Sequence, residues 1–245
     1  MLRLLTPISV VALAASVAFA QSTDAFANAN DEFAAGHFRE ATELYEGMVR
    51  SGEYSGALFY NLGNAWYRAG DFGHAILNYE RALALEPFHP EAQTNLRLAR
   101  DNARALELRK TNVERIASRF TAGQYTVAAA VSFWLAGFVL VLQVVARRRS
   151  RRLTAVLLIS LLVCATSLFG LRTIETGSHG KALAVVVGNK IEARLATAEN
   201  AGTVLALPPG SEIKILSTRG EWAYAALPND LRGWIPAESA QLVRF

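Results

Sequence analysis

Two long uncharged runs dominate the pattern of apolar and polar positions along the chain. Residues 125–146 form a run of 22 residues without a charge, and residues 153–171 form a second run of 19. About 20 apolar residues in a helix cover the ~30 Å hydrocarbon core of a bilayer. The runs therefore predict two transmembrane helices, and the alternative is a helical hairpin buried inside a protein core.

The segment between the runs, residues 147–152, is almost entirely arginine. It contains Arg147, Arg148, Arg149, Arg151 and Arg152. Such a short charged link cannot enter hydrocarbon, and cytoplasmic loops are the ones that carry excess Lys and Arg, so we expect a cytoplasmic loop here. Five basic residues also lie shortly before the first run, at Arg104, Arg109, Lys110, Arg115 and Arg119. The charge count alone therefore leaves the orientation undecided.

The N-terminus decides this orientation. Residues 1–20 contain Arg3, an apolar stretch from Ile8 to Phe19, and the small–x–small pattern Ala18-Phe19-Ala20. This arrangement predicts a cleaved secretory signal peptide, with an uncleaved N-terminal anchor as the alternative. In either case the chain after residue 20 is exported. Both large soluble parts are then expected on the periplasmic side of a bacterial inner membrane.

The part before the first run contains an internal repeat. Residues 22–55 align with residues 56–89 at a period of 34, which pairs Asn30 with Asn64 and Tyr45 with Tyr79. The period and pattern resemble the tetratricopeptide repeat, and the second copy, ALFYNLGNAWYRAGDFGHAILNYERALALEP, matches better than the first. The resemblance implies antiparallel helix pairs. We expect a repeat domain over residues 22–120 whose last part, from Pro90 to Phe120, is a capping helix.

The resemblance also implies a binding surface on the inner side of the first helices, for a peptide or a partner domain. In related repeats the asparagines at the Asn30 and Asn64 positions bind the ligand backbone, since a side-chain amide offers both a donor and an acceptor. The alternative is a stack that packs only against its own protein. The expected surface comprises Phe26, Asn30, Phe33, Tyr60, Asn61, Asn64, Tyr67 and Arg68.

After the second run the pattern changes to short strands separated by turn residues. Strands are expected at 184–187, 203–207, 212–217 and 221–227. In the third, Ile213 and Ile215 alternate with Glu212 and Lys214, which predicts one buried and one solvent-facing side.

Residues 182–245 resemble a bacterial SH3 domain. The resemblance depends on a Pro-Gly turn at 209–210, on Gly220-Glu221-Trp222 and on Gly233-Trp234-Ile235-Pro236. It implies an aromatic groove for extended peptides, including cell-wall peptides, with Trp222, Tyr224 and Trp234 as the candidates. At least one of the three is expected in the core of so small a barrel. A purely structural or docking role is the alternative.

The composition and the absence of known motifs limit the kinds of functional site that the chain is expected to contain. Only 19% of residues are charged, against about 25% in a typical soluble domain, and the formal net charge is +4. The single cysteine, Cys164, excludes a disulfide scaffold and a Cys-rich zinc site. We find no catalytic or phosphate-binding motif, expect neither metal nor other cofactor, and expect no nucleic-acid binding. The helical carboxylates, Glu43, Glu46, Asp71 and Glu80, are interpreted as surface charges.

The expected fold is thus multi-domain: a helical repeat stack, a two-helix transmembrane hairpin and a small all-β barrel. Together with a signal peptide, this order of segments is similar to the BatE-type proteins of the Bacteroides aerotolerance operons. That resemblance implies a non-enzymatic scaffold in an envelope complex with von Willebrand A domain membrane proteins and a MoxR-type ATPase. The alternative is a cell-wall sensor or tether that acts through the SH3 domain.

Overall fold

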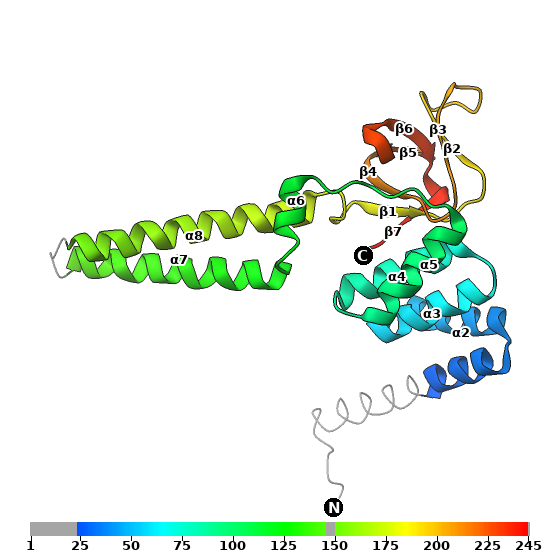
Figure 1. The fold of residues 1–245 in the computed structure, drawn as a ribbon, viewed down its shortest axis with the longest axis horizontal. Helices are drawn as coiled ribbons and strands as arrows, with labels where there is room; N and C mark the ends of the chain where they lie inside the picture. The colour runs from blue at the N-terminus through cyan, green and yellow to red at the C-terminus, as the bar shows by residue number, and fades with distance from the viewer. Residues whose placement is uncertain (1–23, 146–149, 245) are drawn as a thin grey trace, which may run out of the picture.

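The computed structural model describes residues 24–145 and 150–244. It has a helical stack, two long apolar helices that extend together as a rod away from the rest of the molecule, and an antiparallel all-β sheet at the C-terminal end (Figure 1). The expected multi-domain architecture is confirmed. The predicted signal peptide, residues 1–20, and Arg147, Arg148 and Arg149 lie outside the described residues.

The helical stack, hereafter the repeat module, covers residues 24–103. After a helical segment at 24–35 it contains α2 (Phe38–Arg50), α3 (Gly56–Arg68), α4 (Phe72–Leu85) and α5 (Pro90–Ala103). Gly36 and Gly70, which are 34 residues apart, both have φ of 85° at the turn inside each pair, a conformation that glycine adopts without a steric penalty. Side chains of Ser55 and Asp71 cap the N-termini of α3 and α4.

Close helix approach inside the second pair requires a small residue. A Cβ added to Gly63 on α3 would lie 2.7 Å from the ring of Tyr79 on α4. Tyr79 is 1% exposed, and Trp66 packs against the buried clusters on both sides of α3. The two aromatic side chains therefore fill the spaces between helices, as the repeat pattern predicts.

The expected capping helix is interrupted. α5 ends at Ala103 because Arg104 adopts a left-handed conformation (φ 52°), and the chain then runs without helix to Thr111. The backbone of Leu106 bonds instead to the start of strand β4 (Glu212–Arg219) and the residue before it: its N–H donates to Ser211 Oγ and its carbonyl accepts from the N–H of Glu212. The prediction of one helix to Phe120 is wrong, because this segment pairs with a distant part of the chain.

The helical hairpin begins after the short helix α6 (Asn112–Ala117). It consists of α7 (Ala122–Val145) and α8 (Arg151–Thr176), which pack against each other along their length (Figure 1). Both are long and apolar enough to cross a membrane. α7 begins three residues before the first predicted run. α8 begins two residues before the second run, so Arg151 and Arg152 lie in its first turn, and it ends five residues beyond that run.

The C-terminal sheet, hereafter the β module (residues 183–244), is antiparallel throughout, in the order β3-β2-β6-β5-β4-β1-β7. Three strands were not predicted as such: β2 (Ile191–Arg194), β6 (Arg232–Pro236) and β7 (Ala240–Leu242). The four predicted ones are β1 (Leu183–Val186), β3 (Thr203–Leu207), β4 (Glu212–Arg219) and β5 (Trp222–Ala226).

Small and branched residues fill the core of the β module. Along β5 and β6 the buried positions are Ala223, Ala225, Gly233 and Ile235, which alternate with half-buried aromatic residues. None of Trp222, Tyr224 and Trp234 belongs to the buried core. The expectation that a large aromatic side chain is needed there is wrong, because branched residues from several strands close the interior.

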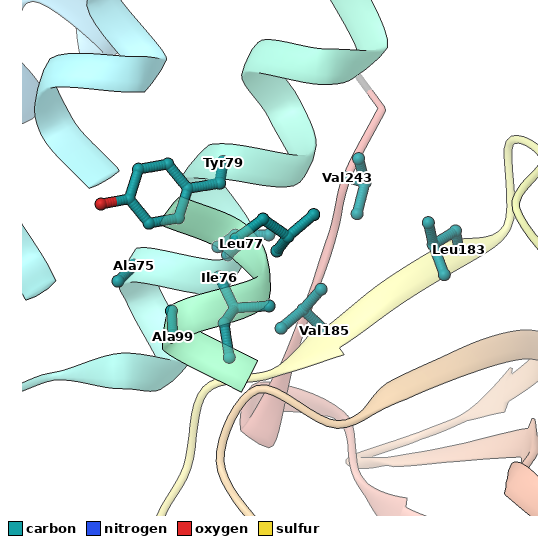
Figure 2. Packing of buried hydrophobic residues seen from close by; sticks show 9 residues of the cluster. Ala75, Ile76, Leu77, Tyr79, Ala99, Leu183, Val185 and Val243 are labelled. Atoms are coloured by element: carbon teal, nitrogen blue, oxygen red, sulfur yellow. The ribbon is translucent and has the colours of Figure 1, made fainter. Parts of the chain in front are cut away.

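A shared apolar cluster joins the repeat module to the β module. Ile76 and Leu77 of α4 lie against Val185 of β1, with Leu183 and Val243 beside them (Figure 2). All five side chains are at most 3% exposed. The β module therefore packs on the second helix of the second pair and leaves the side formed by the first helices uncovered.

Candidate functional site

A cavity of about 250 Å³ lies on the uncovered side of the repeat module. Its walls come from the helical segment 24–35 and from α3 and α5, with Tyr79 of α4 at the back. The lining residues are Phe33, Asn64, Tyr67, Arg68, Tyr79, Asn95 and Leu98. Aromatic, amide, guanidinium and aliphatic groups thus face one small space.

Two asparagines hold the helices of this surface in register. Asn64 Oδ1 accepts from the Tyr79 hydroxyl at 2.8 Å and from Asn95 Nδ2 at 2.9 Å. One repeat earlier, Asn30 Oδ1 accepts from the Tyr45 hydroxyl at 2.5 Å and from Asn61 Nδ2 at 2.9 Å. Because both lone pairs of each oxygen are used, a ligand backbone would meet the Nδ2 donor of Asn64 and not its oxygen.

The tyrosines in these networks remain hydrogen-bond donors. Burial raises the pKa of Tyr45 to about 12, against a smaller opposing effect of Asn61. Burial also raises the pKa of Tyr79, and the neighbouring Tyr60 raises it further. Both hydroxyls therefore stay protonated near neutral pH and keep the asparagine oxygens occupied.

The structure divides the eight predicted surface residues into two groups. Phe33, Asn64, Tyr67 and Arg68 line the cavity, whereas Phe26, Asn30, Tyr60 and Asn61 do not. Among the second group, the ring of Phe26 packs on Tyr45, and the ring of Tyr60 packs on Tyr79 and His89. Their contacts in the structure are internal to the stack.

Asn95 and Leu98 are cavity residues that the sequence analysis did not identify. The sequence pattern predicts α5 only as part of a capping helix, although Asn95 follows Asn61 by the same period of 34 residues. Leu98 is 49% exposed and lies one helical turn beyond Asn95. Continuing the repeat alignment into α5 would have found Asn95.

The cavity rim is held by its neighbours. The Arg68 guanidinium lies 4.6 Å from the centre of the Phe38 ring, and the Tyr67 hydroxyl accepts from Asn102 Nδ2 at 2.7 Å. The Tyr67 ring also packs on Phe72 at 5.5 Å between centroids. These contacts fix a cation and an aromatic ring beside each other, which suits a peptide that carries a carboxylate next to an apolar side chain.

A buried ion cluster links the repeat module to the β module. Arg100 of α5 donates to Glu80 of α4 at 2.5 Å and also to Glu212 of β4. Glu212, which is fully buried, further accepts from the N–H of Leu108 at 2.9 Å and lies 3.2 Å from His179 Nε2. The predictions that Glu80 and Glu212 face solvent are both wrong, because each is paired with Arg100 in the packed interface.

The pKa values of the two carboxylates in this cluster shift in opposite directions. Burial would raise the pKa of Glu212, but the hydrogen bond from His179 and the charge of Arg100 outweigh it and hold that pKa below its ordinary value. Burial raises the pKa of Glu80, and Arg100 offsets only part of the effect. Glu212 has more donors than Glu80, so it keeps the negative charge more strongly.

The three predicted aromatic residues of the β module lie on its outer surface. Tyr224 and Trp234 are opposite each other on β5 and β6, and their ring centroids are 5.0 Å apart. On the other neighbouring strand, β2, the residue opposite Trp234 is Arg194. Trp222 instead lines a separate cavity of about 680 Å³ with Pro236. That cavity also contains Lys190, Glu192, Arg194, Glu199, Glu221 and Glu238.

We searched the described residues for side chains that could hold a metal ion. Within residues 24–145 and 150–244 no three His, Cys, Asp or Glu side chains are placed to hold a metal ion. His74 packs on Trp66 and pairs with Asp71, and His89 caps α5. The described groups of the repeat cavity can hydrogen-bond, stack and pair with charge.

Comparison with known proteins identifies one segment. A comparison with curated proteins finds no match to the chain. The family model of the tetratricopeptide repeat matches residues 56–89, which contain α3 and α4. Repeats of this family are typically non-catalytic modules for protein–protein interaction. Residues 56–89, which contribute four of the cavity residues, are therefore a tetratricopeptide repeat.

Proposed function

We propose that the protein is a non-enzymatic, membrane-anchored adaptor that binds a protein partner through the cavity of the repeat module. The observation that carries this proposal is the combination of a tetratricopeptide repeat with an open cavity on its first helices. The β module covers α4, on the opposite side of the repeat, and leaves the cavity free. The partner segment would place an apolar side chain against Tyr67 and Leu98 and a carboxylate near Arg68.

The two apolar helices would anchor this adaptor. α7 has 24 residues and α8 has 26, so each reaches at least about 36 Å at 1.5 Å per residue, enough for the ~30 Å hydrocarbon core. Their ends toward the repeat module and the β module lie together (Figure 1), so a hairpin that spans a bilayer would leave both modules on the same side. The arginine-rich residues 147–152 would lie in the cytoplasm, and the modules in the periplasm of a bacterial inner membrane.

The resemblance to BatE-type proteins supports a specific class of partner. It points to a von Willebrand A domain membrane protein, in an aerotolerance-type envelope complex that also contains a MoxR-type ATPase. The ATPase would act on the cytoplasmic side, where the arginine-rich residues 147–152 of this chain would face it. The von Willebrand A domain protein would meet the repeat cavity in the periplasm.

Affinity capture tests this function. The full tagged chain is isolated from membranes in mild detergent, and the proteins that accompany it are identified by mass spectrometry. The test variant is Tyr67→Ala with Leu98→Ala, because both residues line the cavity and neither belongs to the asparagine networks. Tyr54→Ala is the matched control, since Tyr54 is 51% exposed on the same module and does not line the cavity.

The expected result is recovery of a von Willebrand A domain protein with the native chain and with the control. Loss of two central contact residues should reduce recovery by about tenfold or more. Equal recovery with the cavity variant, at equal membrane content, would show that the partner binds elsewhere.

A second candidate function rests on the β module. The outer surface with Trp222, Pro236 and charges of both signs fits an extended peptide that itself carries amino and carboxylate groups, such as a cell-wall peptide. Co-sedimentation of the full detergent-solubilised chain with purified cell wall tests it, with Trp222→Ala as the variant. Retention that depends on Trp222 and survives the Tyr67/Leu98 double substitution would favour the sensor or tether.

A further inference from the structure

A second large cavity, of about 810 Å³, lies where the hairpin meets the rest of the protein. Its walls come from the end of α4 and the loop after it, from the segment that joins α6 to α7, and from the last turn of α8. Ala122 and Gly123 at the start of α7, and Thr173 and Ile174 near the end of α8, are among its lining residues. The cavity therefore opens at the level where the apolar rod ends.

Exposed apolar side chains surround this cavity. Phe88, in the loop between α4 and α5, is 84% exposed, and Phe120, just before α7, is 55% exposed. Both line the cavity, and Leu85 at the end of α4, which also lines it, is 51% exposed. Such a group is unfavourable in water, and exposed apolar patches of this kind mark surfaces that contact a membrane or another molecule.

The charges that line the cavity are mainly basic. Lys110, Arg119 and Arg244 contribute three formal positive charges and Glu114 contributes one negative charge, a balance of +2. Glu114 is already engaged, because its carboxylate accepts from the N–H groups of Thr111 and Ser178 and from the Ser178 hydroxyl. The basic side chains are thus the groups available to an anionic ligand.

We propose that this cavity binds the phosphate headgroup of an anionic phospholipid of the membrane that holds the hairpin. Lys110, Arg119 and Arg244 would pair with the phosphate, while Phe88 and Phe120 enter the boundary between headgroups and acyl chains. Continuity with the lipid-facing surface of α7 and α8 favours lipid over a soluble phosphate. The inference rests on the proposed membrane anchoring.

The amount of lipid that the purified protein retains tests whether the three basic side chains recognise an anionic headgroup. The full chain is purified in detergent, exchanged into phosphatidylglycerol or phosphatidylcholine, and examined by native mass spectrometry. The variant carries Lys110→Gln, Arg119→Gln and Arg244→Gln; the matched control carries Arg39→Gln, Arg97→Gln and Arg232→Gln, three exposed arginines outside the cavity. Since each basic residue near an anionic lipid contributes about fivefold in binding, we expect at least about a tenfold loss of bound phosphatidylglycerol in the variant only.

Two results of this experiment would overturn the proposal. One is equal retention of phosphatidylcholine and phosphatidylglycerol by the native chain. The other is displacement of bound phosphatidylglycerol by an equal concentration of glycerol 3-phosphate, which would identify a site for free phosphate instead of lipid.

Depth labelling separates this inference from the anchoring on which it rests. In a Cys164→Ala background, single cysteines replace Phe88, Val141 on α7 or Leu216 on the β module, and each carries a fluorescent label in nanodiscs that contain brominated lipid. We expect quenching at positions 88 and 141 and none at 216. Quenching at 141 alone overturns the lipid site but leaves the anchor intact. Absence of quenching at 141 overturns the anchor and this inference together.

Discussion

The buried ion cluster provides the sharpest test of the packing between the repeat module and the β module. Arg100 is 13% exposed in its side chain and pairs with two buried carboxylates, Glu80 at 12% and Glu212 at 0%, and with the exposed Glu107 at 3.5 Å. Replacement of Arg100 by Met removes the shared cation and leaves two buried carboxylates close together. Replacement of Glu212 by Gln removes one of those charges but keeps a hydrogen-bond acceptor.

The magnitudes follow from burial. Removing one partner of a buried ion pair costs about 3–5 kcal/mol, which is the expected effect of Arg100→Met. Glu212→Gln loses charge-assisted hydrogen bonds and should cost about 1.5–3 kcal/mol. The double variant should be more stable than the sum of the single effects by about 2 kcal/mol, because Glu212→Gln then relieves repulsion from Glu80.

Urea unfolding of the full chain in detergent micelles measures these values, with hydrogen exchange in α5 and β4 as the readout. Arg97→Met, an exposed arginine on the same helix, serves as the control and should change stability by no more than about 0.5 kcal/mol. Additivity of the two cluster substitutions within about 0.5 kcal/mol would refute the reasoning, because residues in contact must show coupling.

Three further predictions concern helix packing, the asparagine network and pH. Gly63→Ala should lower the free energy of unfolding by about 1–3 kcal/mol, since the added Cβ would overlap the Tyr79 ring. The control, Gly47→Ala, whose Cβ would have its nearest neighbour at 3.9 Å, should be neutral or stabilising by up to about 1 kcal/mol. Thermal unfolding followed by circular dichroism measures both. Asn64→Ala leaves the buried Tyr79 hydroxyl without its acceptor and should lower the free energy of unfolding by about 1–3 kcal/mol in the same assay; an unchanged melting temperature would contradict the network. The pKa of Glu212 is lower in the folded than in the unfolded state, so ionised Glu212 stabilises the fold above the unfolded pKa of about 4.3, and this stabilisation is lost as the pH falls through the folded pKa. Hydrogen-exchange protection of β4 should therefore decrease below about pH 4. The decrease should be absent in Glu212→Gln.

The features with a regular period were predictable from the sequence. The 34-residue repeat identified α2, α3 and α4, because Gly36 and Gly70 and the pair Tyr45 and Tyr79 recur at equivalent positions. The two apolar runs identified α7 and α8, since the length and hydropathy of a run are sufficient to predict a long apolar helix. Alternation and turn residues identified four strands of the β module.

Long-range pairing set the limit of prediction. Glu212 alternates with isoleucines as a solvent-facing residue would, and its partner Arg100 lies 112 positions earlier. The break at Arg104 has the same origin, because Leu106 and Leu108 bond to residues of β4 and its preceding turn that no local pattern reveals. Four of the eight residues assigned to the binding surface line the cavity and four do not, since helix periodicity identifies a face but not where on that face a cavity forms.

The central claim is that the repeat cavity holds a protein partner on the membrane side shared with the β module. Site-specific photo-crosslinking in intact membranes tests it most directly, with a photoreactive phenylalanine analogue at Leu98 inside the cavity and at Tyr54 outside it. We predict a crosslink from position 98 to a von Willebrand A domain membrane protein and none from position 54. Equal crosslinking from both positions, or none from position 98, would contradict the adaptor function.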